Sequence, residues 1–175
     1  SGVYGVQPRV YVDGGLGSTW DYKTGKLLSQ AGDCGGFVLM GLARYWHMTR
    51  DAEGKSVVDR AFDYYYSRDI DRFECNGGAM DCASVDREGI QPFFSAAIEM
   101  WKATKEPRYL EYARKAGWYF LSWLYLQNPV YGPETDFSIY NWRPAGSTIV
   151  GTEHPGLDDY GGLLLNELMT LAKTD

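Results

Sequence analysis

The chain of 175 residues repeats itself at an offset of about 55 residues. The segment 45–65 aligns without a gap on the segment 100–120, and each copy contains an apolar helix, a short charged turn and an amphipathic helix. One helical hairpin cannot bury its own apolar face, so repeated hairpins stack on one another. The repeat therefore predicts an all-α fold of stacked hairpins. The matched pairs include Trp46 with Trp101, Thr49 with Thr104, Arg50 with Lys105, Asp51 with Glu106 and Tyr64 with Tyr119.

Apolar periodicity predicts five helices. The first, third and fifth are apolar around most of their girth and are expected inside, whereas the second and fourth are amphipathic and are expected outside. Asp33 is expected to cap the first helix, and Pro107 to open the fourth. Such alternation is what an α/α toroid requires, with an inner and an outer ring of helices. The predicted ranges are 34–49, 53–67, 84–104, 107–127 and 157–172.

Length and the helix number predict one domain over residues 1–175. Residues 1–33 read as an irregular stretch with a short strand at 9–12, and residues 34–175 as about two and a half hairpins. This is about half of a six-hairpin ring, so we expect a segment of a larger toroid. Its flanks would then lack partners, which favours association with the remainder of the toroid or with another copy. The flanking residues are Phe37, Met40, Leu164 and Leu168.

Composition excludes several classes of partner. A net charge of −6, without clustered Lys or Arg, argues against nucleic acid. No apolar run is long enough to span a membrane, and no signal peptide is visible, so localisation stays open with the cytoplasm favoured. Three reduced thiols are expected, and neither a zinc site nor a cofactor, because only two histidines are present. These residues are Cys34, Cys75, Cys82, His47 and His154; His47 reads as a hydrogen-bonded core residue.

A first acidic cluster enters the third predicted helix. It contains Asp86 and Glu88, with Arg87 between them. Residues two apart on a helix point in different directions, so one carboxylate could line a cavity while the other holds Arg87. The ordinary alternative is that acidic side chains favour the first turn of a helix because of its dipole.

A second cluster enters the fifth predicted helix with Glu153, His154 and Asp158. Capping that helix needs only one carboxylate, so the concentration favours a functional role. Because the two clusters belong to neighbouring inner helices, we expect them to face each other across a cavity. Two carboxylates a few ångströms apart are what glycoside hydrolysis requires, one as general acid and one to activate water or attack the sugar.

Aromatic side chains are numerous and offer flat surfaces for sugar rings. The connection 128–156 is long, carries four prolines and several aromatic residues, and is expected to pack as a binding loop. Tyr140 and Trp142 from this loop are candidates for the wall of the acidic site. Trp20 and Arg87 complete the candidate substrate-binding residues.

Two segments resemble a known family, the six-hairpin glycosidases with the (α/α)6 toroid fold. The run 104–113 is similar to the hairpin turns of that family. The pairing of 86–89 with 153–161, across an aromatic loop, looks like the later part of the catalytic domain in bacterial glycosidase-like toroids. The resemblance covers residues 34–175. It implies acid/base carboxylates on the cavity rim, carried here by Asp86, Glu88, Glu153 and Asp158.

The sequence thus favours a carbohydrate-active enzyme segment that hydrolyses a glycosidic bond. A sugar epimerase or isomerase on the same toroid is a weaker alternative, because such enzymes usually rely on histidine bases and only His47 and His154 are present. A non-catalytic helical-repeat binding module is the third possibility. It would present a concave aromatic surface without converging carboxylates.

Overall fold

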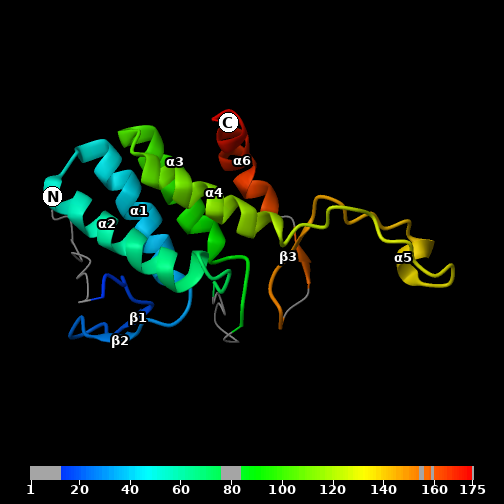
Figure 1. The fold of residues 1–175 in the computed structure, drawn as a ribbon. Coiled ribbons are helices and arrows are strands. Elements are labelled where there is room, and N and C mark those ends of the chain that lie inside the picture. The colour runs from blue at the N-terminus through cyan, green and yellow to red at the C-terminus, as the bar shows by residue number, and fades with distance from the viewer. Residues whose placement is uncertain (1–12, 76–83, 154–155, 159, 175) are drawn as a thin grey trace.

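The computed structural model describes residues 13–75, 84–153, 156–158 and 160–174. These residues form a mostly helical body from which one long loop projects (Figure 1). The expected strand at 9–12 lies outside the described residues. The helices are α1 (Cys34–Thr49), α2 (Ala52–Tyr65) with the π-helical turn η1 (Tyr66–Ile70), α3 (Ile90–Thr104), α4 (Pro107–Leu121), α5 (Asp136–Ile139), the 3-10 turn η2 (Tyr160–Leu164) and α6 (Leu165–Ala172). The strands are β1 (Thr19–Trp20), β2 (Leu27–Ser29), β3 (Thr148–Ile149) and β4 (Leu157–Asp158), paired antiparallel as β1 with β2 and β3 with β4.

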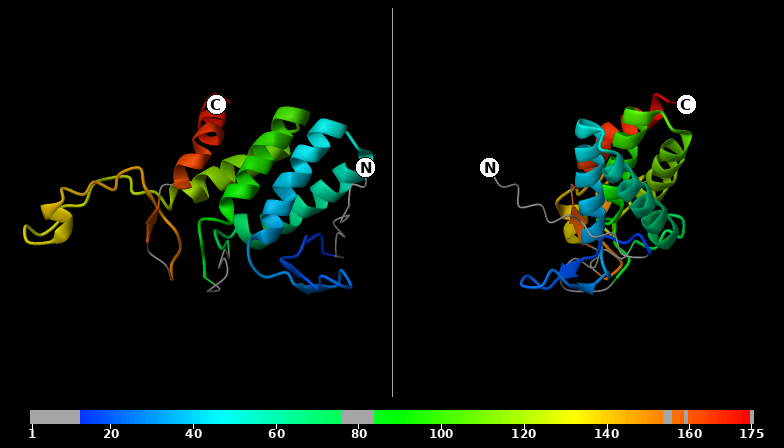
Figure 2. Two further views of the ribbon diagram at one scale, coloured as in Figure 1. Left: turned by 180° about the vertical axis from the view of Figure 1, so that it is seen from behind. Right: turned by 90° about the vertical axis from the view of Figure 1, so that its left-hand side faces the viewer.

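The helices form two layers. Helices α1, α3 and α6 stand side by side in one row, and α2 and α4 form a second layer that crosses this row, nearer the viewer in Figure 1 and behind the row in the left view of Figure 2. Helix α3 is central, because it packs against α1, α4 and α6. The row and its backing layer place hairpin α1–α2 beside hairpin α3–α4, as the repeat predicts.

The sequence repeat is also a repeat of backbone geometry. Arg50 and Lys105 end the first helix of each hairpin in the left-handed region, with φ of 58° and 61°. Each donates its backbone N–H over 2.8 Å to the carbonyl four residues earlier, on Trp46 and Trp101. The next residue in each copy is extended and begins the second helix. Matching turns of this kind set the same angle in both hairpins.

Three helix boundaries differ from the prediction. Helix α3 begins at Ile90 rather than at 84, because residues 85–87 are extended and pair with residues 150–152. Helix α4 ends at Leu121 rather than at 127, since the chain then bridges to Thr148. The predicted helix 157–172 is divided into β4, η2 and the short α6, in keeping with the low helix propensity of two consecutive glycines. The β1–β2 hairpin was not predicted.

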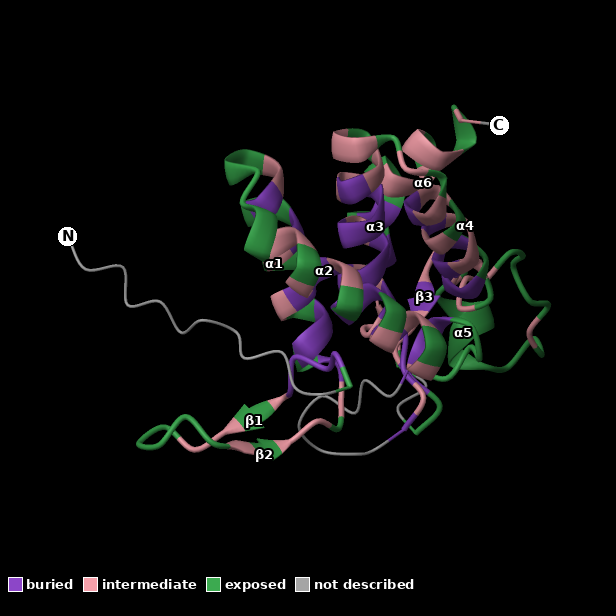
Figure 3. Cartoon of the chain, turned by 60° about the vertical axis from the view of Figure 1, so that its left-hand side comes forward, coloured by how far each residue is buried: buried purple, intermediate pink, exposed green. Residues whose placement is uncertain are grey.

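Burial bears out the expectation that α3 is a core helix but not the division of the other helices into inner and outer ones. Helix α4, expected outside, buries Tyr109, Ala113, Ala116, Gly117, Tyr119 and Phe120. Helix α3 contributes the largest share of the core, including Phe93, Phe94 and Met100 (Figure 3). Helix α1 buries only part of its girth, and α6 contains no buried residue. Asp33 precedes α1, but its side chain accepts no capping hydrogen bond. The two ends of the row are therefore less covered than its centre.

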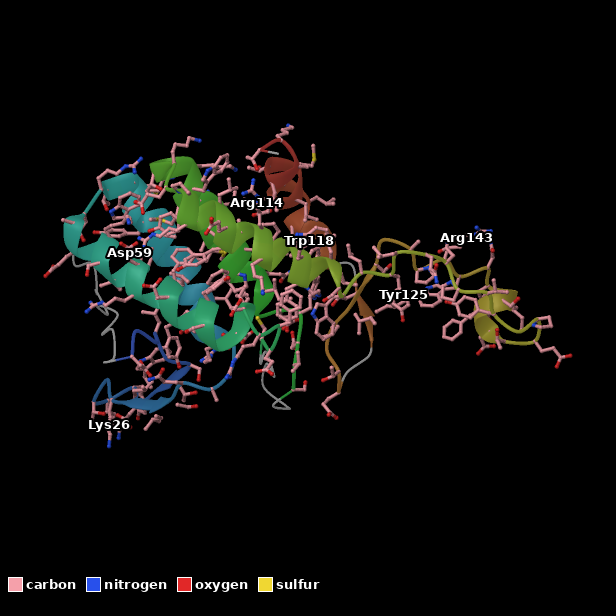
Figure 4. All side chains as sticks on the ribbon, viewed as in Figure 1. Lys26, Asp59, Arg114, Trp118, Tyr125 and Arg143 are labelled. Atoms are coloured by element: carbon pink, nitrogen blue, oxygen red, sulfur yellow. The ribbon has the colours of Figure 1, made fainter. Side chains whose placement is uncertain are left out.

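A polar cluster ties α2 to α4. The Asp59 carboxylate of α2 accepts hydrogen bonds from the Tyr109 hydroxyl, from Arg108 Nη2 at 2.6 Å and from Lys55 Nζ at 2.8 Å (Figure 4). Partial burial alone would raise the pKa of Asp59, but the hydrogen bonds from Lys55, Tyr109 and Arg108 outweigh it and hold the pKa below its ordinary value. The ionised carboxylate is therefore a stabilising link between α2 and α4.

We expect Asp59→Ala to lower the free energy of unfolding by about 2 kcal/mol at neutral pH, because it leaves the buried Tyr109 hydroxyl without its acceptor. A carboxyl with a depressed pKa stabilises above its unfolded pKa, and this contribution is lost as pH falls through the folded pKa. The loss should therefore shrink in acid. Urea unfolding measures both effects. Asp63→Ala is the matched control, because among the described residues that exposed carboxylate accepts a hydrogen bond from the Tyr112 hydroxyl only; an equal loss in both variants would contradict the assignment.

Candidate functional site

The candidate site is built on the extended segment that leads into α3. Asp86 donates its backbone N–H to the Cys75 carbonyl over 2.8 Å, and Arg87 donates to the Val150 carbonyl over 2.9 Å. Asp86 also forms a β-bridge with Gly151. This segment is thus held on both sides by backbone hydrogen bonds, which fixes the direction of its side chains.

The charges of neighbouring carboxyl groups act on Asp86 and Asp33 near the N-terminal ends of α1 and α3. We call Asp33, Asp86 and Glu88 the acidic rim. Asp86 is 5% exposed, and burial raises its pKa to about 6, with further contributions from the negative charges of Glu88 and Asp33. Burial, and then the charge of Glu88, likewise raise the pKa of Asp33. The backbone N–H of Glu88 donates to the Asp86 carboxyl, which limits the rise in its pKa.

Such an arrangement separates the protonation states of neighbouring carboxyl groups. With a pKa of about 6, Asp86 keeps its proton in mildly acidic solution, as a general acid must. Glu88 is less buried than Asp86. The acidic rim can therefore supply a proton donor and a carboxylate base from one short stretch of chain.

A cavity of about 10 Å³, room for about one water molecule, lies beside the rim. The Cys75 thiol lines it, and burial, followed by the charge of Asp69, raises the pKa of this thiol well above its usual value. A thiol that resists ionisation is a poor nucleophile. Cys34 and Cys75 are both free thiols, as expected, and Cys82 lies outside the described residues. The lining residues are Asp33, Gly36, Tyr65, Arg68, Asp69, Ile70, Cys75, Gly89 and Phe93.

Arg87 and Asp158 form a buried ion pair. The fully buried guanidinium of Arg87 donates from Nη2 to Asp158 Oδ2 over 2.7 Å. Asp158 also accepts a hydrogen bond from the Thr148 hydroxyl and one from the Tyr160 backbone N–H. The geometry gives these two residues a role in joining β4 to the start of α3. Because Arg87 and Asp158 are bonded to each other, neither side chain is free to contact a substrate, in contrast to the roles predicted for them.

The second cluster is only partly described. Residues 150–152 run alongside 85–87, so the structure brings the two acidic segments together through backbone pairing rather than through two helix ends. Glu153 is exposed, while His154 lies outside the described residues. The other histidine, His47, is half-buried near the C-terminal end of α1 and hydrogen-bonds Glu99 of α3.

The aromatic loop does not reach the acidic rim, which corrects the expected wall. It projects from the helical body as an arm with α5 at its tip (Figures 1 and 2), and Arg143 on the arm lies far from the helices (Figure 4). Trp142 packs there against Phe137 and Tyr131, with ring centroids 4.8 and 5.8 Å apart, and Tyr140 is exposed. Trp20 lies in β1, beneath α1 (Figure 1).

Asp33 is the rim residue that sequence reasoning missed as a site residue. A signal was present, because extending the 55-residue offset backwards places Asp33 on Glu88. Both residues stand where an inner helix begins. The repeat therefore brings an acidic residue to the same place in both hairpins.

Other classes of site find no support among the described residues. They contain no group of three or more His, Cys, Asp or Glu able to hold a metal ion. No helix within the described ranges is long and apolar enough to cross a membrane. The sequence matches no family model, and neither a curated protein nor a solved structure matches it.

Proposed function

We propose that this chain is part of an α/α-toroid enzyme that hydrolyses glycosidic bonds at the acidic rim. The observation that carries the proposal is Asp86, a buried carboxyl with a pKa of about 6 that lies next to further carboxylates. Glycoside hydrolysis requires this combination of one protonated and one ionised carboxyl group.

In the proposed mechanism Asp86 gives its proton to the leaving oxygen of the glycosidic bond as that bond breaks. Glu88, the less buried of the two, either takes a proton from an attacking water or attacks the sugar itself. The carboxyl separation in the substrate complex distinguishes these routes, at about 5–5.5 Å for retention and about 6.5–9.5 Å for inversion. The negative charge of Asp33 helps to keep the proton on Asp86.

The position of His47 favours hydrolysis over the epimerase alternative. His47 is bonded to Glu99 near the far end of α1, about 20 Å along the helix from its N-terminal end. It therefore supplies no base at the acidic rim. A binding module, the third alternative, has no use for a carboxyl group held partly protonated near neutral pH.

The test is to assay Asp86→Asn and Glu88→Gln on a panel of aryl glycosides and oligosaccharides. Each variant should lose about a hundredfold or more in kcat, because proton transfer and base catalysis contribute that much. The wild-type rate should fall as pH rises through about 6, where Asp86 loses its proton. Glu53→Gln on the exposed side of α2 is the control and should keep full activity. The assay uses the complete toroid enzyme; a wild-type enzyme that cleaves nothing on the panel, or full activity in both rim variants, would overturn the proposal.

A further inference from the structure

Helix α1 carries an exposed stripe on the side away from α3. Met48 is 78% exposed, and Phe37 and Tyr45 are exposed as well. Figure 3 shows the exposed parts of α1 in green. Arg44 lies among them and is exposed as well. Spacings of three, four and seven residues place these side chains on one face of the helix. We call this set the α1 stripe.

The repeat shows what the α1 stripe is built to receive. Phe37, Arg44 and Met48 correspond, 55 residues later, to Pro92, Glu99 and Ala103 on α3.

On α3 these three positions contact α1. A Cβ on Gly36 would lie 3.1 Å from Pro92 Cγ, His47 bonds Glu99, and Arg50 Nη1 donates to the Ala103 carbonyl over 3.2 Å. The α1 stripe thus repeats the surface of α3 that accepts a neighbouring inner helix.

The other end of the row offers the matching surface. A second alignment, of Gly161-Gly162 with Gly35-Gly36, places Leu165 on Leu39 and Met169 on Ala43. In α1, the residues Gly36, Leu39 and Ala43 are buried.

Their counterparts at the other end are exposed. Gly162 has nothing within 4 Å of an added Cβ, Leu165 is largely exposed, and Met169 is 56% exposed. The opposite side of α6 contacts α3, where the Glu167 carboxylate accepts a hydrogen bond from the Ser95 hydroxyl over 2.7 Å. We call Gly162, Leu165 and Met169 the α6 face.

We propose that two copies of this chain associate head to tail, with the α6 face of one copy packed on the α1 stripe of the next. The contact would repeat the packing of α1 on α3. Stacked repeats normally end in polar capping surfaces, and both surfaces here are largely apolar. Because the two surfaces differ, the contact is heterologous, so it either closes a ring or extends further.

Light scattering coupled to size exclusion tests this directly. The wild-type chain should have a mass above that of the monomer, increasing from micromolar to millimolar concentration. Met48→Glu on the α1 stripe and Met169→Glu on the α6 face should each shift the population strongly towards monomer. Trp118→Glu is the matched control, because Trp118 is 70% exposed on the outer helix α4 and should leave the mass unchanged (Figure 4).

Mixing the two variants distinguishes a heterologous contact from a symmetric one. Met48→Glu retains an intact α6 face, and Met169→Glu retains an intact α1 stripe, so an equimolar mixture should form a dimer that neither forms alone. Circular dichroism checks that each variant is folded, and Phe37→Ser is a second α1 variant. A wild-type chain that is monomeric throughout, or a mixture that stays monomeric, would overturn the proposal.

Discussion

Asp158→Ala should lower the free energy of unfolding by about 3–5 kcal/mol, the largest loss that we expect from a single substitution outside the apolar core. The reason is the fully buried guanidinium of Arg87, whose Nε and Nη1 have no hydrogen-bond partner among the residues that the structure describes. Removing Asp158 would leave this cation without its carboxylate in a site that excludes water. Urea unfolding at neutral pH measures the loss.

Two further variants make this expectation specific. Glu153→Ala removes an exposed carboxylate from the same part of the chain and should change stability by less than about 0.5 kcal/mol. The double variant Arg87→Met with Asp158→Leu replaces the ion pair by apolar groups of similar size, and should recover much of the loss. If Asp158→Ala were as stable as the wild type, the ion pair would have no structural role.

Asp86→Asn should have the opposite effect and stabilise the protein by about 1–3 kcal/mol at neutral pH, since a shift of one pKa unit corresponds to about 1.4 kcal/mol. Folding raises the pKa of Asp86 from 3.8 to about 6, so the ionised side chain opposes folding. That penalty is absent below the unfolded pKa, grows as pH rises from about 4 to 6, and is complete above the folded pKa. Asparagine keeps an oxygen that accepts the Glu88 backbone N–H but carries no charge.

Unfolding curves over a range of pH test this sign. The stability of Asp86→Asn relative to the wild type should be near zero below the unfolded pKa and greatest above about pH 6. Asp63→Asn, which removes an exposed carboxylate from α2, should show no such gain. A gain that does not depend on pH, or a loss at neutral pH, would contradict the raised pKa. A more stable but inactive variant is the signature of a charge retained for catalysis.

The parts of the fold that follow from local patterns were predictable. The range of α1 agrees with its prediction, and α4 begins at Pro107 as expected, because apolar periodicity and a first-turn proline are encoded within a few residues. The two turns at Arg50 and Lys105 agree because the sequence around them repeats. His47 is hydrogen-bonded, as its place on an apolar helix indicated, but it is half-buried rather than a core residue.

The parts that depend on distant pairing were not predictable. The acidic residues before α3 favour a helix start locally, but the backbone of 85–87 pairs with 150–152, more than sixty positions along the chain. The same pairing buries Arg87 against Asp158 and removes both from the surface. Aromatic content marked the loop with Trp142 as a packed segment, yet nothing in its composition shows that it points away from the helices.

The acidic rim has a consequence for how such a site arises. Asp33 and Glu88 hold the same place in two copies of one hairpin, so copying the hairpin also copies the charge. A chain that grows by duplication gathers carboxylates at one end of its inner row without any separate selection for their proximity. Part of the repulsion that raises the pKa of Asp86 therefore comes from a residue whose position the hairpin repeat itself sets.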